Sequence, residues 1–203
     1  MQTIERRAHA PSALAGDLLD LLRQRRTTPL FLPDAVPEEV LEEALDAGRF
    51  APNHKRTEPW RFTVVGPDTK EALTPLWTAV ALSRLPADAT EERREEARRA
   101  SRAKWESKPT VVVVSQVLDP DPFRREEDYA AVACAIQNVQ LAAWALGLGS
   151  QWSTTAATRD AAVLARLGIP ETERVVGFLF VGYPAAVPEA RRRPLEEVLR
   201  RTP

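Results

Sequence analysis

Six segments of the chain are expected to be helices, most of them because apolar residues recur at helical spacing. The first begins at Ser12, a good capping residue, and ends in basic side chains, which complement the helix dipole. The longest and most apolar runs from Glu126 to Leu146, and Gly147 and Gly149 are expected to end it. The others are expected over 37–48 with Gly48 as the stop, over 69–85 where Pro75 starts or kinks the helix, over 91–105, and up to Leu167 before a capping Gly168.

Continuous runs of β-branched and aromatic residues predict the strands. Thr110 to Val117 is the strongest, Trp60 to Val65 is a second, and both are expected to be buried on both faces of a sheet. Val175 to Val181 is a third apolar strand. No internal repeat or linker interrupts the pattern. We therefore expect one α+β domain over residues 1–203, in which residues 1–11 form a flexible N-terminal extension.

Composition narrows the class of protein. With 44% apolar and 28% charged residues among 203, the chain has the composition of an ordinary globular domain, and its net charge of −1 gives no general attraction to nucleic acid or anionic lipid. Asp17 and Asp20 interrupt the first apolar run, so neither a signal peptide nor a membrane-spanning helix is expected there, and a cytoplasmic location is expected.

Cysteine and histidine are too scarce for a zinc-ribbon or a His-based metal centre. The single cysteine, Cys134, excludes an intrachain disulfide and is expected to be a small core residue. With only His9 and His54 available and no metal expected, the chemistry is expected to sit in a borrowed cofactor.

The triplet Arg25-Arg26-Thr27 ends the first predicted helix. Two guanidinium groups and a hydroxyl are suited to binding a phosphate through charge-assisted hydrogen bonds. The simpler interpretation is that basic residues in a last helical turn complement the helix dipole without any ligand.

A polar loop, Ala51 to Trp60, lies between two prolines immediately before a predicted strand. It concentrates the donors Asn53, His54, Lys55 and Arg56, and is held at both ends rigidly enough to present them to a flat polar ring. The alternative is a solvated surface turn with His54 exposed.

Two further segments carry possible binding groups. Residues 147–155 alternate glycine, aromatic and hydroxyl residues but have neither the GxGxxG nor the GxxxxGK[ST] spacing, so the alternative is a helix stop that leads into an edge strand. Arg191-Arg192-Arg193 near the C-terminus form either a second phosphate clamp or a solvated charge run.

Taken in chain order, with Val176 to Pro184 between the 147–155 segment and the basic tail, these segments resemble the FMN-dependent nitroreductase family. The likeness covers nearly everything after residue 15 and is closest to the small YdjA-like branch, whose Pro-Asp-His-Lys and Gln-Pro-Trp correspond to Pro52-Asn53-His54-Lys55 and Glu58-Pro59-Trp60 here. The resemblance implies a central, mostly antiparallel sheet flanked by helices. It also implies an intertwined homodimer with two FMN sites between the subunits, so that neither monomer functions alone.

The resemblance also implies roles for particular residues. Arg25, Arg26 and Thr27 would hold the FMN phosphate and ribityl chain, while Asn53, His54 and Arg56 would reach the flavin from the second subunit. Trp152, Ser153 and Thr154 would lie along the isoalloxazine edge, where a backbone N–H faces N5, and Arg191 and Arg193 would form the late basic pair at the phosphate. A nicotinamide cofactor would bind at Ala142, Ala143, Trp144, Ala145, Leu146 and Gly147.

The implied activity is a ping-pong cycle in which NAD(P)H reduces FMN and a flat electrophile, such as a nitroaromatic or a quinone, is then reduced over the same flavin face. No catalytic side chain is required. Glu58 in place of the usual glutamine, and Phe50 in place of an arginine, leave the flavin potential open. The alternatives are a flavin-sequestering protein with little turnover and a specialised flavin dehydrogenase or dehalogenase, whose selectivity would reside in residues 91–105.

Overall fold

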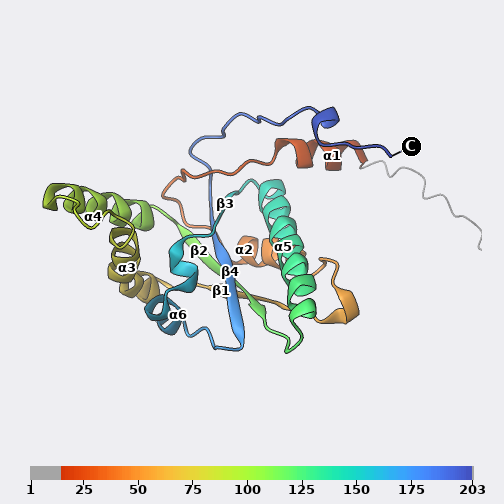
Figure 1. Cartoon of the computed structure of the whole chain (residues 1–203). Helices are drawn as coiled ribbons and strands as arrows, with labels where there is room; N and C mark the ends of the chain where they lie inside the picture. The colour runs from red at the N-terminus through yellow and green to blue at the C-terminus, as the bar shows by residue number, and fades with distance from the viewer. Residues whose placement is uncertain (1–14, 203) are drawn as a thin grey trace, which may run out of the picture.

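The computed structural model describes residues 15–202, whose four strands form one antiparallel sheet with helices on both faces (Figure 1). The strand order is β1-β2-β4-β3. The elements are α1 (Ala15–Gln24), α2 (Glu38–Gly48), the 3-10 helix η1 (His54–Arg56), β1 (Trp60–Val64), α3 (Pro67–Leu82), α4 (Glu91–Glu106), β2 (Thr110–Val117), α5 (Pro122–Ala145), β3 (Gly149–Ser153), η2 (Ala156–Arg159), α6 (Ala161–Leu167), β4 (Glu173–Gly182) and η3 (Leu195–Glu197). The predicted α+β class and mostly antiparallel sheet are confirmed. The predicted extension over 1–11 and the cap at Ser12 lie outside the described residues.

Alternate residues of β2 and β4 pack into two separate cores. Val112 and Leu179 face the core formed with α2 and α5, whereas Val111 and Phe178 face the core formed with α3 and α6. The central strands are apolar without interruption because side chains on both faces are buried.

The prediction that β1 is buried on both faces is wrong. Within the described chain β1 pairs only with β2 and so lies at the sheet edge. Trp60 is buried, but Arg61 is exposed and Val64 is 50% exposed. A run of apolar residues does not reveal whether a second strand will flank it. The alternative given for residues 147–155, a helix stop that leads into an edge strand, is confirmed as β3, which within the described chain pairs only with β4.

Two helix boundaries differ from the prediction for local reasons. Helix α5 starts at Pro122, earlier in the chain than the predicted Glu126. The side chain of Asp121 accepts a hydrogen bond from the Phe123 N–H at 3.0 Å and so caps the helix. In α3, Pro75 lies inside the helix and Pro67 starts it. The predicted stop at Gly48 is confirmed, since Gly48 is the last residue of α2. An added Cβ there would lie 2.8 Å from Val139 Cγ2, so close packing against α5 requires glycine.

The prediction that Cys134 is a core residue is also wrong, because the thiol is exposed on α5. Every described helix is too short or too polar to cross a membrane. Within residues 15–202, no three His, Cys, Asp or Glu side chains come together as metal ligands.

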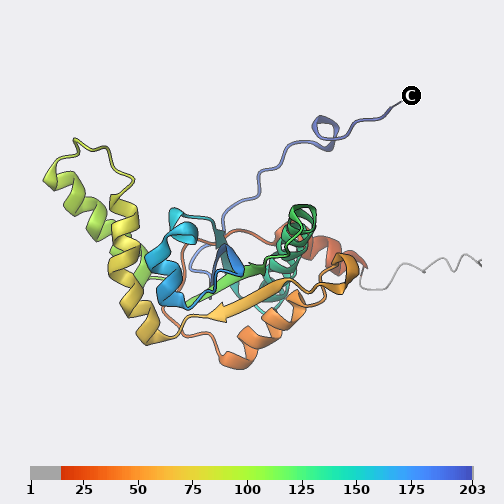
Figure 2. The same ribbon diagram turned by 60° about the horizontal axis from the view of Figure 1, so that its bottom comes forward.

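Helices α3 and α4 project together from one side of the sheet (Figures 1 and 2). Although α4 is polar almost all round, Trp105 near its end is buried and stacks on Trp77 of α3, with ring centroids 4.4 Å apart. On the opposite side, the exposed C-terminal tail after residue 184 runs away from the body of the chain (Figure 2).

Candidate functional site

The segment after α1 lies directly beside β3. Thr27 pairs with Ser150 in a parallel bridge, and the Thr28 backbone N–H donates to the Ser150 carbonyl at 3.0 Å. Thr28 is fully buried, and Gln140 of α5 donates from Nε2 to Ser150 Oγ at 3.2 Å. Two predicted binding segments separated by 122 residues are thus joined by the fold.

Gly149 makes this junction possible. A Cβ at this position would lie 2.2 Å from Thr28 Oγ1 and 3.2 Å from Pro184 Cβ. The two backbones therefore approach more closely than any other residue type allows.

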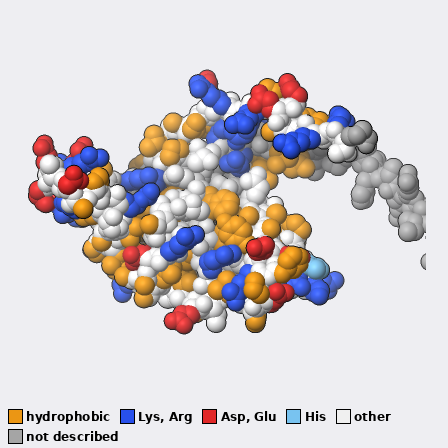
Figure 3. Space-filling view, viewed as in Figure 1, with side chains coloured by type: hydrophobic (Ala, Val, Ile, Leu, Met, Phe, Trp, Pro, Cys, Tyr) orange, Lys and Arg blue, Asp and Glu red, His pale blue; other side chains and the backbone are white. Residues whose placement is uncertain are grey.

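Arg25 and Arg26 directly precede this junction, and the charge of a third arginine, Arg192 of the tail, acts on Arg25. Burial, and then the positive charges of Arg192 and Arg26, lower the pKa of Arg25 from its usual value. Arg25 Nε is buried without a hydrogen-bond partner, and none of the three arginines forms an ion pair with an acid anywhere in residues 15–202. In Figure 3, Lys and Arg side chains gather on the upper part of the face where Figure 1 shows α1 and the tail.

This arrangement is unfavourable for the protein alone and favourable for a bound anion. The charges of Arg26 and Arg192 oppose that of Arg25, and a bound anion would offset this repulsion and supply an acceptor for the unpaired Nε. The simpler interpretation, in which the basic residues only complement the α1 dipole, does not account for the participation of Arg192.

Trp152, Ser153 and Thr154 continue from this junction along and beyond edge strand β3. The indole of Trp152 packs over Gly177 of β4, where a Cβ would lie 2.2 Å from Trp152 Nε1. That Nε1 and the nearby Thr155 Oγ1 are buried without hydrogen-bond partners. The indole of Trp152 is therefore fixed against β4, and binding roles for Trp152, Ser153 and Thr154 stay predictions.

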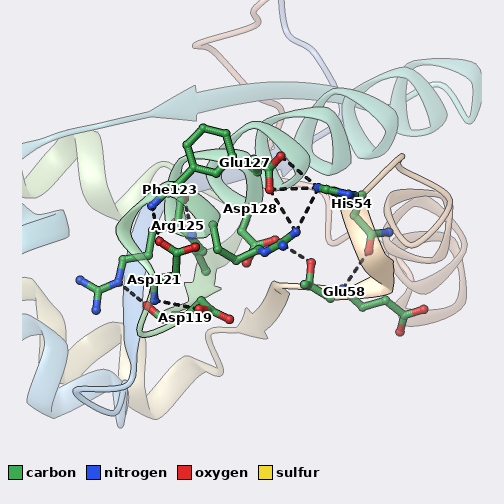
Figure 4. A network of polar contacts seen from close by, with 12 residues as sticks. His54, Glu58, Asp119, Asp121, Phe123, Arg125, Glu127 and Asp128 are labelled. Carbon is green, nitrogen blue, oxygen red and sulfur yellow. Dashed lines mark hydrogen bonds and ion pairs between the residues drawn. The ribbon is translucent and has the colours of Figure 1, made fainter.

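The polar loop is held by α5 (Figure 4). His54 Nδ1 lies 3.0 Å from Glu127 Oε1 and 3.1 Å from the Arg124 guanidinium, and the Thr57 hydroxyl donates to buried Asp128 at 2.6 Å. The Glu58 N–H donates to Asn53 Oδ1 at 3.1 Å.

The backbone of this loop is strained. Lys55, Arg56 and Glu58 have φ of 57°, 55° and 44°, in the left-handed region that costs non-glycine residues energy. Such strain persists only where surrounding contacts impose it, and it concentrates at functional sites. His54 is largely exposed, but Glu127 and Arg124 fix its position, so the loop is more than a solvated turn.

Within one chain, the loop and the arginines lie at opposite ends of α5. His54 contacts Glu127 near the start of the helix, while β3 follows its end at Ala145. The 18 residues between these points span roughly 27 Å at a rise of 1.5 Å per residue. The structure therefore does not bring the two predicted halves of the site together in a single copy (Figure 1).

The predicted nicotinamide segment occupies the end of α5 and the turn after it. Ala143 is fully buried, and Ala142 and Leu146 pack against the same core. Gly147 adopts φ 80°, which lets the Leu148 N–H return to the Ala143 carbonyl at 2.8 Å. The local role of these residues is structural, and their contact with a nicotinamide cofactor stays a prediction.

Sequence reasoning missed Lys108, a 2% exposed lysine that links several of these segments. Its Nζ donates to the Pro29 carbonyl at 2.6 Å, lies 3.5 Å from Gln151 Oε1, and stands over the rings of Phe31 and Phe180. Burial, followed by the charge of Lys104, lowers the pKa of Lys108. A single lysine ahead of an apolar strand carries no pattern by which it could have been found.

Thr57→Val is expected to lower the free energy of unfolding by about 1–3 kcal/mol, because it leaves the buried Asp128 carboxylate without its hydroxyl donor. Denaturant unfolding would measure this change. Thr63→Val, on β1, removes a hydroxyl without such a buried partner among the described residues and is the matched control. Equal midpoints for the two variants would contradict a role for Asp128 in holding the loop.

Comparison with known proteins gives consistent matches. The sequence model of the nitroreductase family matches residues 22–183. YfhC of Bacillus subtilis, provisionally named an NAD(P)H nitroreductase, is 33% identical over 177 residues, which are 87% of this chain and 89% of YfhC.

Solved structures match the same fold. A nitroreductase-like family protein from Bacillus cereus is 30% identical, with a TM-score of 0.78, over 91% of this chain and 95% of that one. A nitroreductase with bound FMN from Bacteroides fragilis is 27% identical, with a TM-score of 0.65, over 88% of this chain and 94% of that one.

Proposed function

Because the chain belongs to the nitroreductase family and is an oxidoreductase, we propose that it binds FMN and uses NAD(P)H to reduce flat electrophiles such as nitroaromatics or quinones. The observation that carries this proposal is the group of Arg25, Arg26 and Arg192, which has no acidic partner in the described chain and contains a buried, unpaired Nε beside β3.

These residues fit the phosphate end of FMN. A dianionic phosphate offers acceptors to several guanidinium N–H groups at once, and Thr27 adds a hydroxyl at the same place. Ser153 and Thr154 continue from this point and would lie along the ring system. Arg192, rather than Arg191 or Arg193, is the tail arginine whose charge acts on Arg25, so we assign the third phosphate contact to it.

Bound FMN would supply a carrier that accepts two electrons from NAD(P)H and releases them to a second substrate. The residues of the chain would bind and orient this carrier and exclude water from it. For a nitroaromatic acceptor, NAD(P)H is oxidised to NAD(P)⁺, while the nitro group takes two electrons and two protons and becomes nitroso with loss of water.

The complete site is proposed to require a homodimer. The loop with Asn53, His54 and Arg56 lies too far from Arg25 in the same chain and would serve the site of the second copy. Large apolar side chains exposed on α1 and beside the loop, including Leu18, Leu22 and the 77% exposed Phe50, are suited to burial against that copy.

A direct test combines absorption, mass and reduction kinetics. The purified protein is expected to be yellow and to sediment at twice the 22.6 kDa of one chain. Under anaerobic stopped flow, NADH or NADPH is expected to bleach the flavin band within seconds. Bleaching over many minutes would instead favour a flavin-sequestering protein, and a colourless monomer that takes up no added FMN would refute the proposal.

A further inference from the structure

A pocket lies between the projecting α3–α4 pair and the ends of β3 and β4. Its volume is about 340 Å³, large enough for a single substituted aromatic ring. Its lining includes Ser153 and Thr155, so it opens beside the segment proposed to follow the FMN ring.

Its walls are aromatic. Trp77, Trp105 and Phe180 line the pocket, and Trp77 stands at 72° to Phe180 with the ring centroids 6.2 Å apart. Rings fixed in this way offer both faces and edges to a flat aromatic guest.

Its charged groups are all basic. Arg84, Lys104 and Lys108 line the pocket, and no acidic side chain lies among its described lining residues. Burial is the main cause of the lowered pKa of Lys108, and the charge of Lys104 is the second. A bound anion would offset both effects by favouring the charged form of Lys108. Lys108 Nζ donates one of its three protons to the Pro29 carbonyl and lies 3.5 Å from Gln151 Oε1, so at least one proton is available to a ligand.

Two hydroxyl groups in the lining lack partners. Ser101 Oγ and Thr155 Oγ1 are both buried without a hydrogen bond, one from α4 and the other from the turn after β3. An unsatisfied buried hydroxyl is costly, and such groups are rare in native structures. A carboxylate bound in the pocket would offer an acceptor to such a hydroxyl.

We propose that this pocket binds an aromatic monocarboxylate and that the preferred electron acceptors of this protein are aromatic electrophiles bearing a carboxylate. The inference rests on the proposed function for the flavin chemistry, but the binding site itself does not depend on turnover. A neutral aromatic of the same shape loses the interaction with the basic groups and leaves a basic, desolvated pocket without its counter-charge.

Binding is tested on the oxidised holoprotein with benzoate and its neutral isostere benzamide, by calorimetry and by quenching of tryptophan fluorescence. Benzoate is expected to bind at least tenfold more tightly than benzamide. Lys104→Met and Ser101→Ala are each expected to weaken benzoate binding by about tenfold, as for loss of one charge-assisted hydrogen bond. Arg93→Met removes a positive charge elsewhere on α4 and is expected to leave benzoate binding unchanged.

Turnover gives a second readout. With 4-nitrobenzoate and 4-nitrobenzamide as acceptors, kcat/KM is expected to be at least tenfold higher for the anion, and Lys104→Met is expected to remove most of that ratio. Equal binding of benzoate and benzamide, or unchanged benzoate binding in Lys104→Met, would overturn the inference even if NAD(P)H reduces the flavin normally. Absence of flavin reduction with selective benzoate binding would instead refute only the proposed function.

Discussion

The double variant Arg25→Ala with Arg26→Ala is expected to be purified without its yellow colour. Each guanidinium group contributes about 1.5–3 kcal/mol as a charge-assisted hydrogen-bond donor to phosphate, so the pair together lowers FMN affinity by roughly two to four orders of magnitude. The free energy of unfolding without FMN is expected to fall little, because the two charges repel each other and have no acidic partner in the described chain. FMN titration followed by fluorescence quenching measures the affinity directly.

Arg23→Ala is the matched control for this experiment. Arg23 lies on the same helix, but its side chain is 71% exposed and pairs with Asp20 at 3.3 Å. Its loss is expected to leave FMN affinity unchanged. Single substitutions in the tail refine the assignment, since Arg192→Ala should weaken FMN binding more than Arg191→Ala does. Retention of bound flavin by the double variant would show that the phosphate is held elsewhere.

Gly149→Ala is expected to damage both stability and the cofactor site through a single methyl group. The added Cβ would lie 2.2 Å from Thr28 Oγ1 and 2.9 Å from Thr28 Cβ, and Thr28 cannot retreat because it is fully buried. Overpacking of this kind costs about 1–3 kcal/mol of stability. The added methyl group also separates the Arg25–Thr28 segment from β3, so FMN affinity should fall as well. Denaturant unfolding measures the loss of stability, and FMN titration on the same preparation measures the loss of affinity.

Gly66→Ala tests whether the effect comes from the site or from glycine replacement in general. Gly66 precedes α3, has φ −69°, and an added Cβ there meets no atom within 4 Å. It is expected to be neutral or slightly stabilising. Combining Gly149→Ala with Thr28→Ala removes the closest contact, so the double variant should be more stable than the two single effects predict by addition. Strict additivity would argue against a clash at this junction.

The opposite placement of the two predicted half-sites has a consequence for these experiments. If the loop with His54 serves the flavin held by the second copy, its substitutions weaken FMN binding only in the dimer. Dilution below the dimer dissociation constant should therefore release FMN from the wild-type protein. This coupling follows from the distance between the loop and Arg25 along α5.

The sequence by itself determined the local elements and the chemistry available to them. Thr110–Val117 and the cap at Gly168 were predicted to the residue, because a β-branched run and a left-handed glycine depend on nearby positions alone. The order of the binding segments was also sufficient to identify the nitroreductase family, which the comparison confirms.

Only the tertiary structure decided which residues meet. The approach of Thr28 to Ser150, the effect of the Arg192 charge on Arg25 and the burial of Lys108 beside two aromatic rings all join residues distant in the chain. The exposure of Cys134 and the half-exposure of β1 depend on whether another element of the fold packs against them. Local sequence patterns determine the backbone conformation that a few neighbouring residues prefer. Burial and the interaction between charges depend instead on contacts between residues far apart in the sequence, and such contacts leave no periodic pattern in it.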